Sequence, residues 1–139
     1  MFTNRRDVTI EWGDCDPAGI VFYPRYFAMF DASTAFLFAS AGFPKQELRR
    51  RYDFIGWPMV DTRARFLIPS AFGDVITIES RVTTWKTSSF ELEHRVFKGE
   101  SLAIEGFETR VWTGPHPDHP GRLKSRPVPA EIIARFKQP

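Results

Sequence analysis

The segment from Tyr23 to Ser40 constrains the fold more than any other part of the chain. Its large apolar side chains recur at helical spacing, and Phe36 and Phe38 widen the apolar stripe almost to the full circumference. Gly42 stands where a glycine commonly ends a helix. A helix that is apolar on nearly every side must be buried, so the rest of the chain has to fold around it.

The remainder of the chain has mainly the pattern of β-strands. A first strand at 7–12 is predicted because Val8, Ile10 and Trp12 alternate with polar residues. After Trp57, apolar residues again alternate with polar ones between clusters of turn residues. Four further strands are therefore expected, at 57–68, 74–86, 89–98 and 101–112.

The apolar alternation of the last of these strands changes phase. Leu102 and Ile104 are followed by Phe107 and Val111, which fall on the other face of a regular strand. One extra residue would bring the apolar side chains back to a single face. The sequence therefore predicts a β-bulge near 105–106.

These elements follow one another as a strand, a long helix and a run of strands without crossover helices, so the sheet is expected to be mainly antiparallel. Short helices are expected after Pro44 and Pro129, and GPHPDHPG is expected to be a loop. The class is thus α+β. A single sheet wrapped around one helix leaves long strand edges, which are commonly covered by a second copy of the chain.

Composition excludes several classes of protein. A length of 139 residues is typical of one domain, so residues 1–139 are expected to form a single domain, and the one cysteine excludes a disulfide framework. The longest apolar run, Ala35 to Ala39, is far shorter than the roughly 20 residues of a membrane span, and the first residues contain no apolar signal segment. We therefore expect a cytoplasmic protein with no membrane partner.

Charge gives little support for nucleic-acid binding. Lys and Arg number 19 and Asp and Glu 17, for a net charge of +2. Basic residues do gather between Arg122 and Lys137. That segment is either a basic edge for a phosphorylated ligand or an ordinary solvated surface.

The loop from Gly13 to Val21 carries the strongest candidate chemistry. Asp14 and Asp16 stand between a strand and the start of the buried helix, where backbone N–H groups can hold an oxyanion and a carboxylate can act as nucleophile or base. The same residue types are also common at the entry to a helix. The acids do not continue in the alternating pattern of a Ca²⁺ loop. Spacing alone leaves the catalytic and the structural interpretation open.

Two other groups are weaker candidates. His116, Asp118 and His119 are metal-ligand types, but the prolines around them indicate a stiff exposed turn and no other ligand cluster is present, so no metal site is expected. Cys15 and His94 could in principle form a nucleophile–base pair. His94 lies within a predicted strand, however, and is expected simply to fill a strand face.

The loop and helix start, GDCDPAGIVFYPRY followed by FDAS, resemble the hotdog-fold 4-hydroxybenzoyl-CoA thioesterase family. Acyl-CoA thioesterases of this kind carry the looser pattern D-x-D-x-x-G-x-V-x-x-x-x-Y. Shorter similarities occur at GWPMV, DVITIE and RVW, and the predicted order of elements is also that of the family. The resemblance implies a hotdog fold, in which a mainly antiparallel sheet wraps around one long apolar helix.

The resemblance also implies an acyl-CoA thioesterase. Asp16 matches the catalytic carboxylate, which would attack the thioester carbonyl or activate a water molecule that does. The backbone N–H of Tyr23 matches the donor that holds the oxyanion, and Asp14 and Asp31 match residues that orient the loop and the helix. The expected substrate contacts are Trp57, Pro58 and Met59 in the ligand site, and Lys86, Thr87, Ser88, Lys124 and Arg126 near the CoA nucleotide.

In this interpretation CoA is part of the substrate, no cofactor or metal is needed, and the chain forms a homodimer or homotetramer. A hydratase of the same fold would need a His base, which the loop and central helix lack. The alternative is a non-catalytic module that binds acyl-CoA or another protein. The Phe-rich helix and Trp57 suit an aromatic or medium-chain acyl group, and the resemblance favours a 4-hydroxybenzoyl or related aryl group while permitting short acyl chains.

Overall fold

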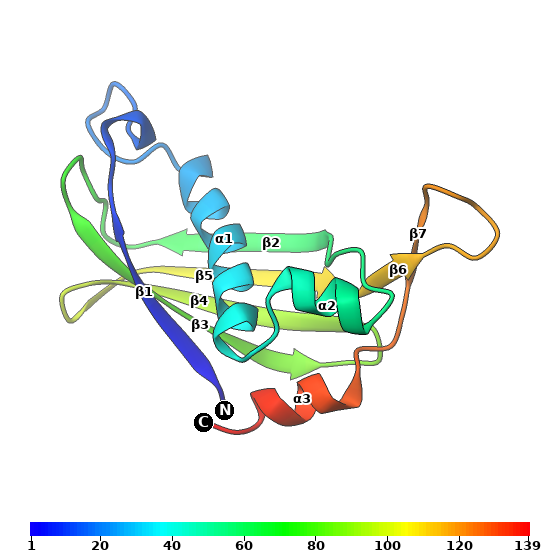
Figure 1. Ribbon diagram of the computed structural model, residues 1–139. Coiled ribbons are helices and arrows are strands. Elements are labelled where there is room, and N and C mark those ends of the chain that lie inside the picture. Colours follow the sequence, from blue (N-terminus) through cyan, green and yellow to red (C-terminus); the bar gives the residue numbers. More distant parts are fainter.

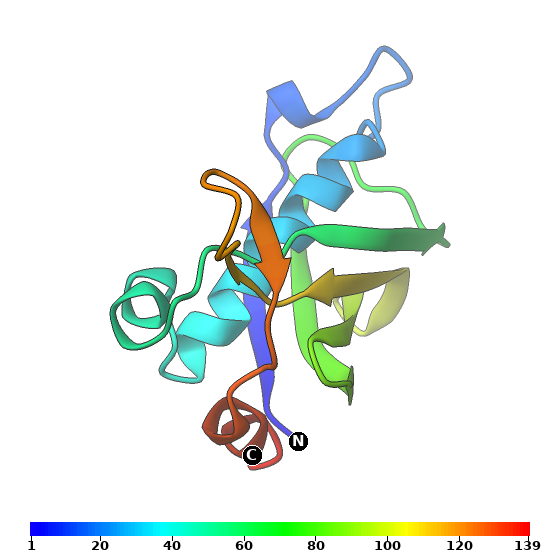
Figure 2. The same cartoon turned by 90° about the vertical axis from the view of Figure 1, so that its right-hand side faces the viewer.

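A computed structural model describes all residues from 1 to 139. The long helix α1 (Pro24–Ser40) crosses the inner face of one curved sheet, and the shorter α2 (Lys45–Arg51) and α3 (Ala130–Phe136) lie near its far end (Figure 1). The view turned by 90° places all three helices on one side of the sheet (Figure 2). The predicted α+β class, with one long helix enclosed by a sheet, is confirmed.

Five strands form the sheet, in the spatial order β1-β3-β4-β5-β2. Every neighbouring pair is antiparallel, as the absence of crossover helices predicts. β1 and β2 are the two edges of the sheet. The strand bounds are Thr3–Thr9 for β1, Met59–Phe66 for β2, Val75–Trp85 for β3, Ser89–Lys98 for β4 and Ser101–Val111 for β5.

Helix α1 agrees with its prediction to within one residue. Pro24 begins the helix, where its missing N–H and fixed φ cost nothing. Gly42 follows the end of the helix with a φ of +100°, which a residue with a side chain rarely adopts. Tyr26, Phe30 and Leu37 are among the side chains that α1 buries against the sheet.

The first strand lies earlier than predicted, at Thr3–Thr9 instead of 7–12. The alternation of apolar residues misplaced it, because the inward-facing residues at its start are polar. Arg6 is one of these, and its guanidinium donates to Ser33 Oγ at 2.8 Å and to the Met29 carbonyl at 2.9 Å on α1. The chain leaves the sheet after Thr9 and forms a 3₁₀ turn, η1 (Trp12–Asp14).

The bulge in β5 exists, but not at the predicted position of 105–106. Pairing with β4 shifts between Val96 and Phe97, which leaves Ala103 as the extra residue. Gly106 is instead a regular ladder residue beneath Phe30, and a Cβ there would lie 2.5 Å from the Phe30 ring. The predicted bulge would have turned Phe107 toward the core. Because the bulge lies earlier, Phe107 is instead on the opposite face of the strand from the buried Gly106.

The predicted loop after residue 113 contains a small hairpin. β6 (Thr113–Pro115) pairs with β7 (Leu123–Ser125), and this hairpin projects from the end of the sheet (Figure 1). Trp112 N–H donates to Ser88 O at 2.7 Å and Val128 N–H donates to Thr87 O at 2.9 Å. These bonds fasten the hairpin base to the turn between β3 and β4.

The core between α1 and the sheet consists of two apolar clusters with a polar layer between them. One cluster surrounds Phe30 near the start of α1, and the other surrounds Phe38 near its end. The strand positions between the clusters are occupied by Ser80, His94 and Glu108, all with at most 2% of their surface exposed. Three neighbouring strands thus each turn a polar side chain inward, Ser80 opposite His94 and Glu108 two residues beyond the partner of His94 on β5.

Candidate active site

The loop that contains Asp16 is closed by its own backbone. Cys15 and Val21 form an isolated antiparallel bridge, and Asp16 N–H donates to Ile20 O at 3.0 Å. One carboxylate oxygen of Asp16 accepts the N–H of Ala18 at 2.8 Å, which fixes the side-chain orientation. The other carboxylate oxygen has no partner in the protein. Asp16 is therefore held in place with one oxygen free to react.

The chain next to this loop presents an unused hydrogen-bond donor. Phe22 N–H donates to Asp14 O at 2.8 Å, which orients the backbone immediately before α1. Pro24 has no N–H, and the Tyr23 N–H donates to no acceptor within the chain. It points from the start of a 17-residue helix, where the helix dipole favours negative charge. This N–H can hold the oxyanion that develops when a carbonyl is attacked.

Two hollows flank the loop. A hollow of about 400 Å³ borders Asp16 and is otherwise lined by Trp12, Cys15, Pro17, Gly19 and Phe72. A second hollow, of about 230 Å³, borders Tyr23 and is mostly apolar. Phe66 at the end of β2 lines it, as does Tyr26, whose phenol pKa is raised by burial. The structure thus places the candidate nucleophile and the candidate oxyanion donor seven residues apart in the segment that leads into α1, and each residue borders a hollow of its own.

The predicted ligand-contact segment divides into a buried and an exposed part. Trp57 is only 4% exposed and packs against Phe38 and Phe54, with ring centroids 4.5 and 5.1 Å away. The Trp57 ring is therefore part of the hydrophobic core of its own chain. Pro58 and Met59 are exposed at the start of β2. Within one chain, Pro58 and Met59 therefore offer accessible side chains to a ligand, and the Trp57 ring does not.

The predicted CoA contacts lie together at the opposite end of the sheet from Asp16. Lys86 and Ser88 belong to the turn between β3 and β4, which is bonded to the base of the β6–β7 hairpin. Lys124 is exposed on β7. Arg126 is half-buried and donates to Pro115 O at 2.7 Å, so part of its role is to hold the hairpin. Figure 1 shows the loop before α1 at one end of the molecule and the β6–β7 hairpin at the other, so the two groups of residues belong to opposite ends of one chain's fold.

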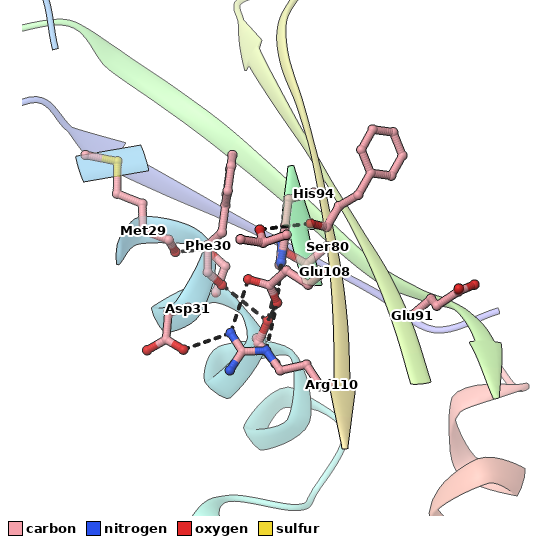
Figure 3. Close-up of polar contacts among 12 residues, drawn as sticks. Met29, Phe30, Asp31, Ser80, Glu91, His94, Glu108 and Arg110 are labelled. Carbon is pink, nitrogen blue, oxygen red and sulfur yellow. Dashed lines mark hydrogen bonds and ion pairs between the residues drawn. The ribbon is translucent and has the colours of Figure 1, made fainter. Parts of the chain in front are cut away.

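The sequence did not predict the buried charge network in the polar layer (Figure 3). Glu108 accepts hydrogen bonds from Thr34 Oγ1 at 2.7 Å and from Arg110 at 3.1 Å, and its Oε1 lies 3.2 Å from His94 Nε2. The other His94 ring nitrogen lies 2.7 Å from Ser80 Oγ. His94, which was expected only to fill a strand face, is thus part of a polar network that ties α1 to three strands.

Arg110 connects this network to the surface. Its guanidinium donates to Glu108, to Asp31 Oδ1 at 2.8 Å and to the Trp57 carbonyl at 3.2 Å. Burial raises the pKa of Glu108, but the hydrogen bonds and charges of His94 and Arg110 outweigh this and lower it to about 2. Glu108 is therefore ionised, and its charge is balanced inside the protein by Arg110.

One sequence signal could have revealed this network. His94 is two residues from Leu92 and from Val96, and Glu108 is two residues from Gly106. Residues two apart share a face of a strand, so both polar residues lie on the buried face. The prediction hid this for Glu108, because a bulge at 105–106 would turn residue 108 away from the core, whereas the actual bulge at Ala103 turns it inward.

The two weaker candidate groups, Cys15 with His94 and the histidines of the hairpin loop, form no catalytic pair and no metal site. Cys15 Sγ lies 3.8 Å from Glu11 O, whereas His94 bonds within the core, so the two do not form a pair. The rings of His116 and His119 lie 4.6 Å apart in the hairpin loop. No group of three or more His, Cys, Asp or Glu side chains is arranged to hold a metal ion. None of the helices is both long and apolar enough to cross a membrane.

A carboxylate and a free N–H at the start of a helix that a sheet wraps are the groups that hydrolysis of a thioester requires. Residues 10–136 match the family model described as Thioesterase-like superfamily, and the chain belongs to this superfamily. The 4-hydroxybenzoyl-CoA thioesterase of Pseudomonas sp. strain CBS-3 is 35% identical over 131 residues, which cover 89% of this chain and 90% of that protein.

Two solved structures are similar along nearly their whole length. An Asp-to-Asn mutant of 4-hydroxybenzoyl-CoA thioesterase, complexed with 4-hydroxybenzoyl-CoA, gives a TM-score of 0.88 at 31% identity and covers 98% of this chain and 99% of its own. A gentisyl-coenzyme A thioesterase gives 0.82 at 30% identity, with coverage of 97% and 100%. Both similarities extend over the sheet, α1 and the Asp16 loop.

Proposed function

We propose that this protein hydrolyses CoA thioesters to a free acid and CoA, with Asp16 as the reacting carboxylate. The observation that carries the proposal is the segment before α1, which holds Asp16 with one carboxylate oxygen free and leaves the Tyr23 N–H without a partner. A thioester carbonyl is readily polarised by such a donor. Relatives named as 4-hydroxybenzoyl-CoA thioesterase and as acyl-CoA thioester hydrolase support the reaction.

Two routes use the same two groups. In the first, Asp16 attacks the carbonyl carbon, the oxyanion is held by Tyr23 N–H, the CoA thiolate leaves, and water hydrolyses the acyl–Asp16 anhydride. In the second, Asp16 accepts a proton from a water molecule as that water attacks, and the proton then passes to the departing thiolate. Neither route requires a metal or a cofactor.

An aryl-CoA such as 4-hydroxybenzoyl-CoA is the substrate class we favour, with short or medium acyl chains as the wider class. Similarity to a 4-hydroxybenzoyl-CoA and to a gentisyl-CoA thioesterase supports an aryl group. The direct test is thiol release from a panel of aryl- and alkyl-CoA thioesters, compared by kcat/KM. Binding of acyl-CoA with no hydrolysis of any of them would contradict the proposal.

A homodimer formed through β2 would complete the site. Apart from the half-buried Ala64, β2 is exposed along its whole length, and Val60 and Phe66 are 60% and 48% exposed. Such an edge favours pairing with another strand. The other edge, β1, turns polar side chains outward and is the poorer partner.

Antiparallel pairing of two β2 strands would place opposite ends of the two chains together. Phe66 packs against Tyr23, with ring centroids 6.4 Å apart, so this end of β2 belongs to the Asp16 site. The partner subunit's Met59 would then lie beside it. Lys86 and Lys124 lie at the Met59 end of the sheet, so the cations of one subunit would serve the carboxylate of the other.

The protein is accordingly expected to sediment as a dimer or tetramer at micromolar concentration, and not as a 16.1 kDa monomer. Co-expression tests the shared site more directly. An Asp16→Asn chain and a Lys86→Ala/Lys124→Ala chain should form mixed dimers that contain one intact site, so their KM for acyl-CoA should return toward that of the unmodified protein at about half its kcat. A stable monomer, or no recovery in verified mixed dimers, would refute the shared site.

The Lys86→Ala/Lys124→Ala variant is expected to raise KM for acyl-CoA several-fold while kcat changes little. Each exposed cation contributes only about 0–1 kcal/mol to phosphate binding, and salt screens it over about 8–10 Å. The difference from the unmodified protein should therefore shrink at high salt. A truncated thioester without the nucleotide should be hydrolysed equally well by both proteins, and an equal loss with that substrate would contradict a CoA contact.

A further inference from the structure

We infer that Arg110 is a positioning residue that acts across the proposed dimer, because it holds the start of β2 where that segment borders the partner subunit's Asp16 site. The inference rests on the proposed function and its β2 dimer, and it adds a residue on which substrate binding depends. It follows from the contacts of one buried guanidinium, which joins the polar layer of the core to the edge strand β2.

Every nitrogen of the Arg110 guanidinium has an acceptor (Figure 3). Nε and Nη2 each donate to one carboxylate oxygen of Glu108 at 3.1 Å, Nη2 also donates to Asp31 Oδ1 at 2.8 Å, and Nη1 donates to the Trp57 carbonyl at 3.2 Å. The side chain of Arg110 is 4% exposed and that of Asp31 64%, so water weakens the Asp31 contact. The two-point contact with the buried Glu108 therefore fixes the guanidinium, and the fixed guanidinium holds the Trp57 carbonyl.

The start of β2 has few other bonds to the neighbouring strand β5. The pairing shifts between Met59 and Asp61, so Val60 is an extra residue that bulges out of the ladder. Pro58 has no N–H to donate, and its carbonyl accepts a backbone N–H of β5 at 3.2 Å, the long end of the usual range. A side chain, Arg110, therefore does part of the work that the ladder does elsewhere in the sheet.

The start of β2 lies at the other end of the sheet from its own Asp16. Figure 1 shows β2 running from the end of the sheet that carries β6 to the end that carries the loop before α1. In the proposed antiparallel dimer, the start of one β2 meets the end of the other, where Phe66 packs against Tyr23. Pro58 and Met59 would then border the partner's site, so their displacement would change that site and not the site of their own chain.

Fold stability alone does not call for an arginine at this position. A buried ion pair can often be exchanged for uncharged side chains with little loss of stability. An uncharged apolar side chain at position 110 cannot, however, supply the donor for the Trp57 carbonyl. The double variant Glu108→Gln/Arg110→Met leaves no buried charge without a partner, so it should keep the fold while it releases the start of β2.

In homodimers, Glu108→Gln/Arg110→Met should raise KM for benzoyl-CoA about ten-fold and change kcat less than about three-fold, because the reacting groups stay intact. The same rise should appear with the benzoyl thioester of N-acetylcysteamine, which lacks the nucleotide. Ser80→Ala is the matched control, since it removes a buried hydrogen bond of the same polar layer on β3 and leaves β2 untouched, so its KM should not change. An unchanged KM in the double variant, or an equal rise in the control, would overturn the inference.

Mixed dimers with one working Asp16 show in which chain Arg110 acts. In the first, one chain carries Asp16→Asn and the other the double variant, so the working Asp16 meets a β2 start that Arg110 still holds, and KM should be normal. In the second, one chain carries all three substitutions and the other none, so the working Asp16 meets a released β2 start, and KM should be about ten-fold higher. The opposite order, or the same KM in both dimers, would refute action across the interface.

Direct binding separates this inference from the reaction itself. Undiminished hydrolysis by Asp16→Asn would refute the proposed function, and the Kd of benzoyl-CoA would then decide the inference, with the same ten-fold weakening expected in homodimers of the double variant. Sedimentation should show that the double variant keeps the oligomeric state of the unmodified protein. Dissociation of the double variant into monomers would mean that Arg110 supports the interface and not the site, and the inference would be wrong.

Discussion

Asp16→Asn is expected to lower kcat for CoA thioesters by about 100- to 10,000-fold, the range typical of losing an essential acid–base or nucleophilic carboxylate. Asn keeps the oxygen that accepts the Ala18 N–H, so the loop should keep its shape. It cannot act as a carboxylate nucleophile or accept a proton from water. Steady-state kinetics with benzoyl-CoA, or with whichever thioester reacts fastest, measures the effect.

The binding behaviour of this variant is the control. KM, or Kd from direct binding, should remain within a few-fold of that of the unmodified protein, and the urea midpoint should not shift. A near-normal kcat would remove Asp16 from the reaction. A single turnover in ¹⁸O-water that labels the Asp16 carboxylate would identify the nucleophilic route, because water can place its oxygen on Asp16 only by attacking the Asp16 carbonyl of an acyl–Asp16 anhydride.

Arg110→Met is expected to destabilise the fold by about 3–5 kcal/mol, the usual cost of leaving a buried charge without its partner. The variant leaves the Glu108 carboxylate ionised and 2% exposed without its cation. Removing both charges together, as Glu108→Gln with Arg110→Met, should recover a large part of the loss. Urea unfolding measures all three proteins, and an Arg110→Met cost below about 1 kcal/mol would show that the pair is not needed.

The same pair predicts a pH dependence. The Glu108 pKa is about 2 in the folded protein, below its ordinary 4.5, so ionised Glu108 stabilises the fold fully above that ordinary value. The contribution is lost as the pH falls from about 4.5 toward 2. Arg110→Met removes a cation that lowers the pKa of Glu108, so the variant lacks this stabilisation even near pH 7. Its deficit relative to the unmodified protein should therefore narrow on acidification from near pH 7 to below pH 4.

Local signals were sufficient for the helices and most strands. α1 is recognisable because its apolar residues, Pro24 and Gly42 all agree on where it starts and ends. The bounds of β4 and α2 follow the sequence prediction, since turn residues flank both. β1 was misplaced because Arg6 faces inward and is satisfied by α1, a tertiary contact that no local pattern contains.

The candidate site was predictable only where it is continuous in sequence. Asp16 and Tyr23 lie on one short loop, so a motif could identify them together. The ligand-contact residues were harder, because exposure separates Trp57 from Met59 and only the fold reveals which is buried. His94, Glu108 and Arg110 come from two strands, and their meeting depends on a bulge whose position the sequence did not fix.

The polar layer also determines how the strands can align. Sliding β4 by two residues against its neighbours would keep the same side chains facing α1, so apolar burial alone distinguishes such alignments poorly. The slide would, however, move His94 away from Ser80 in either direction and into one of the apolar clusters. The Ser80–His94 hydrogen bond therefore fixes the alignment of β3 and β4, because a slide by two residues in either direction leaves a buried His94 ring nitrogen without its partner.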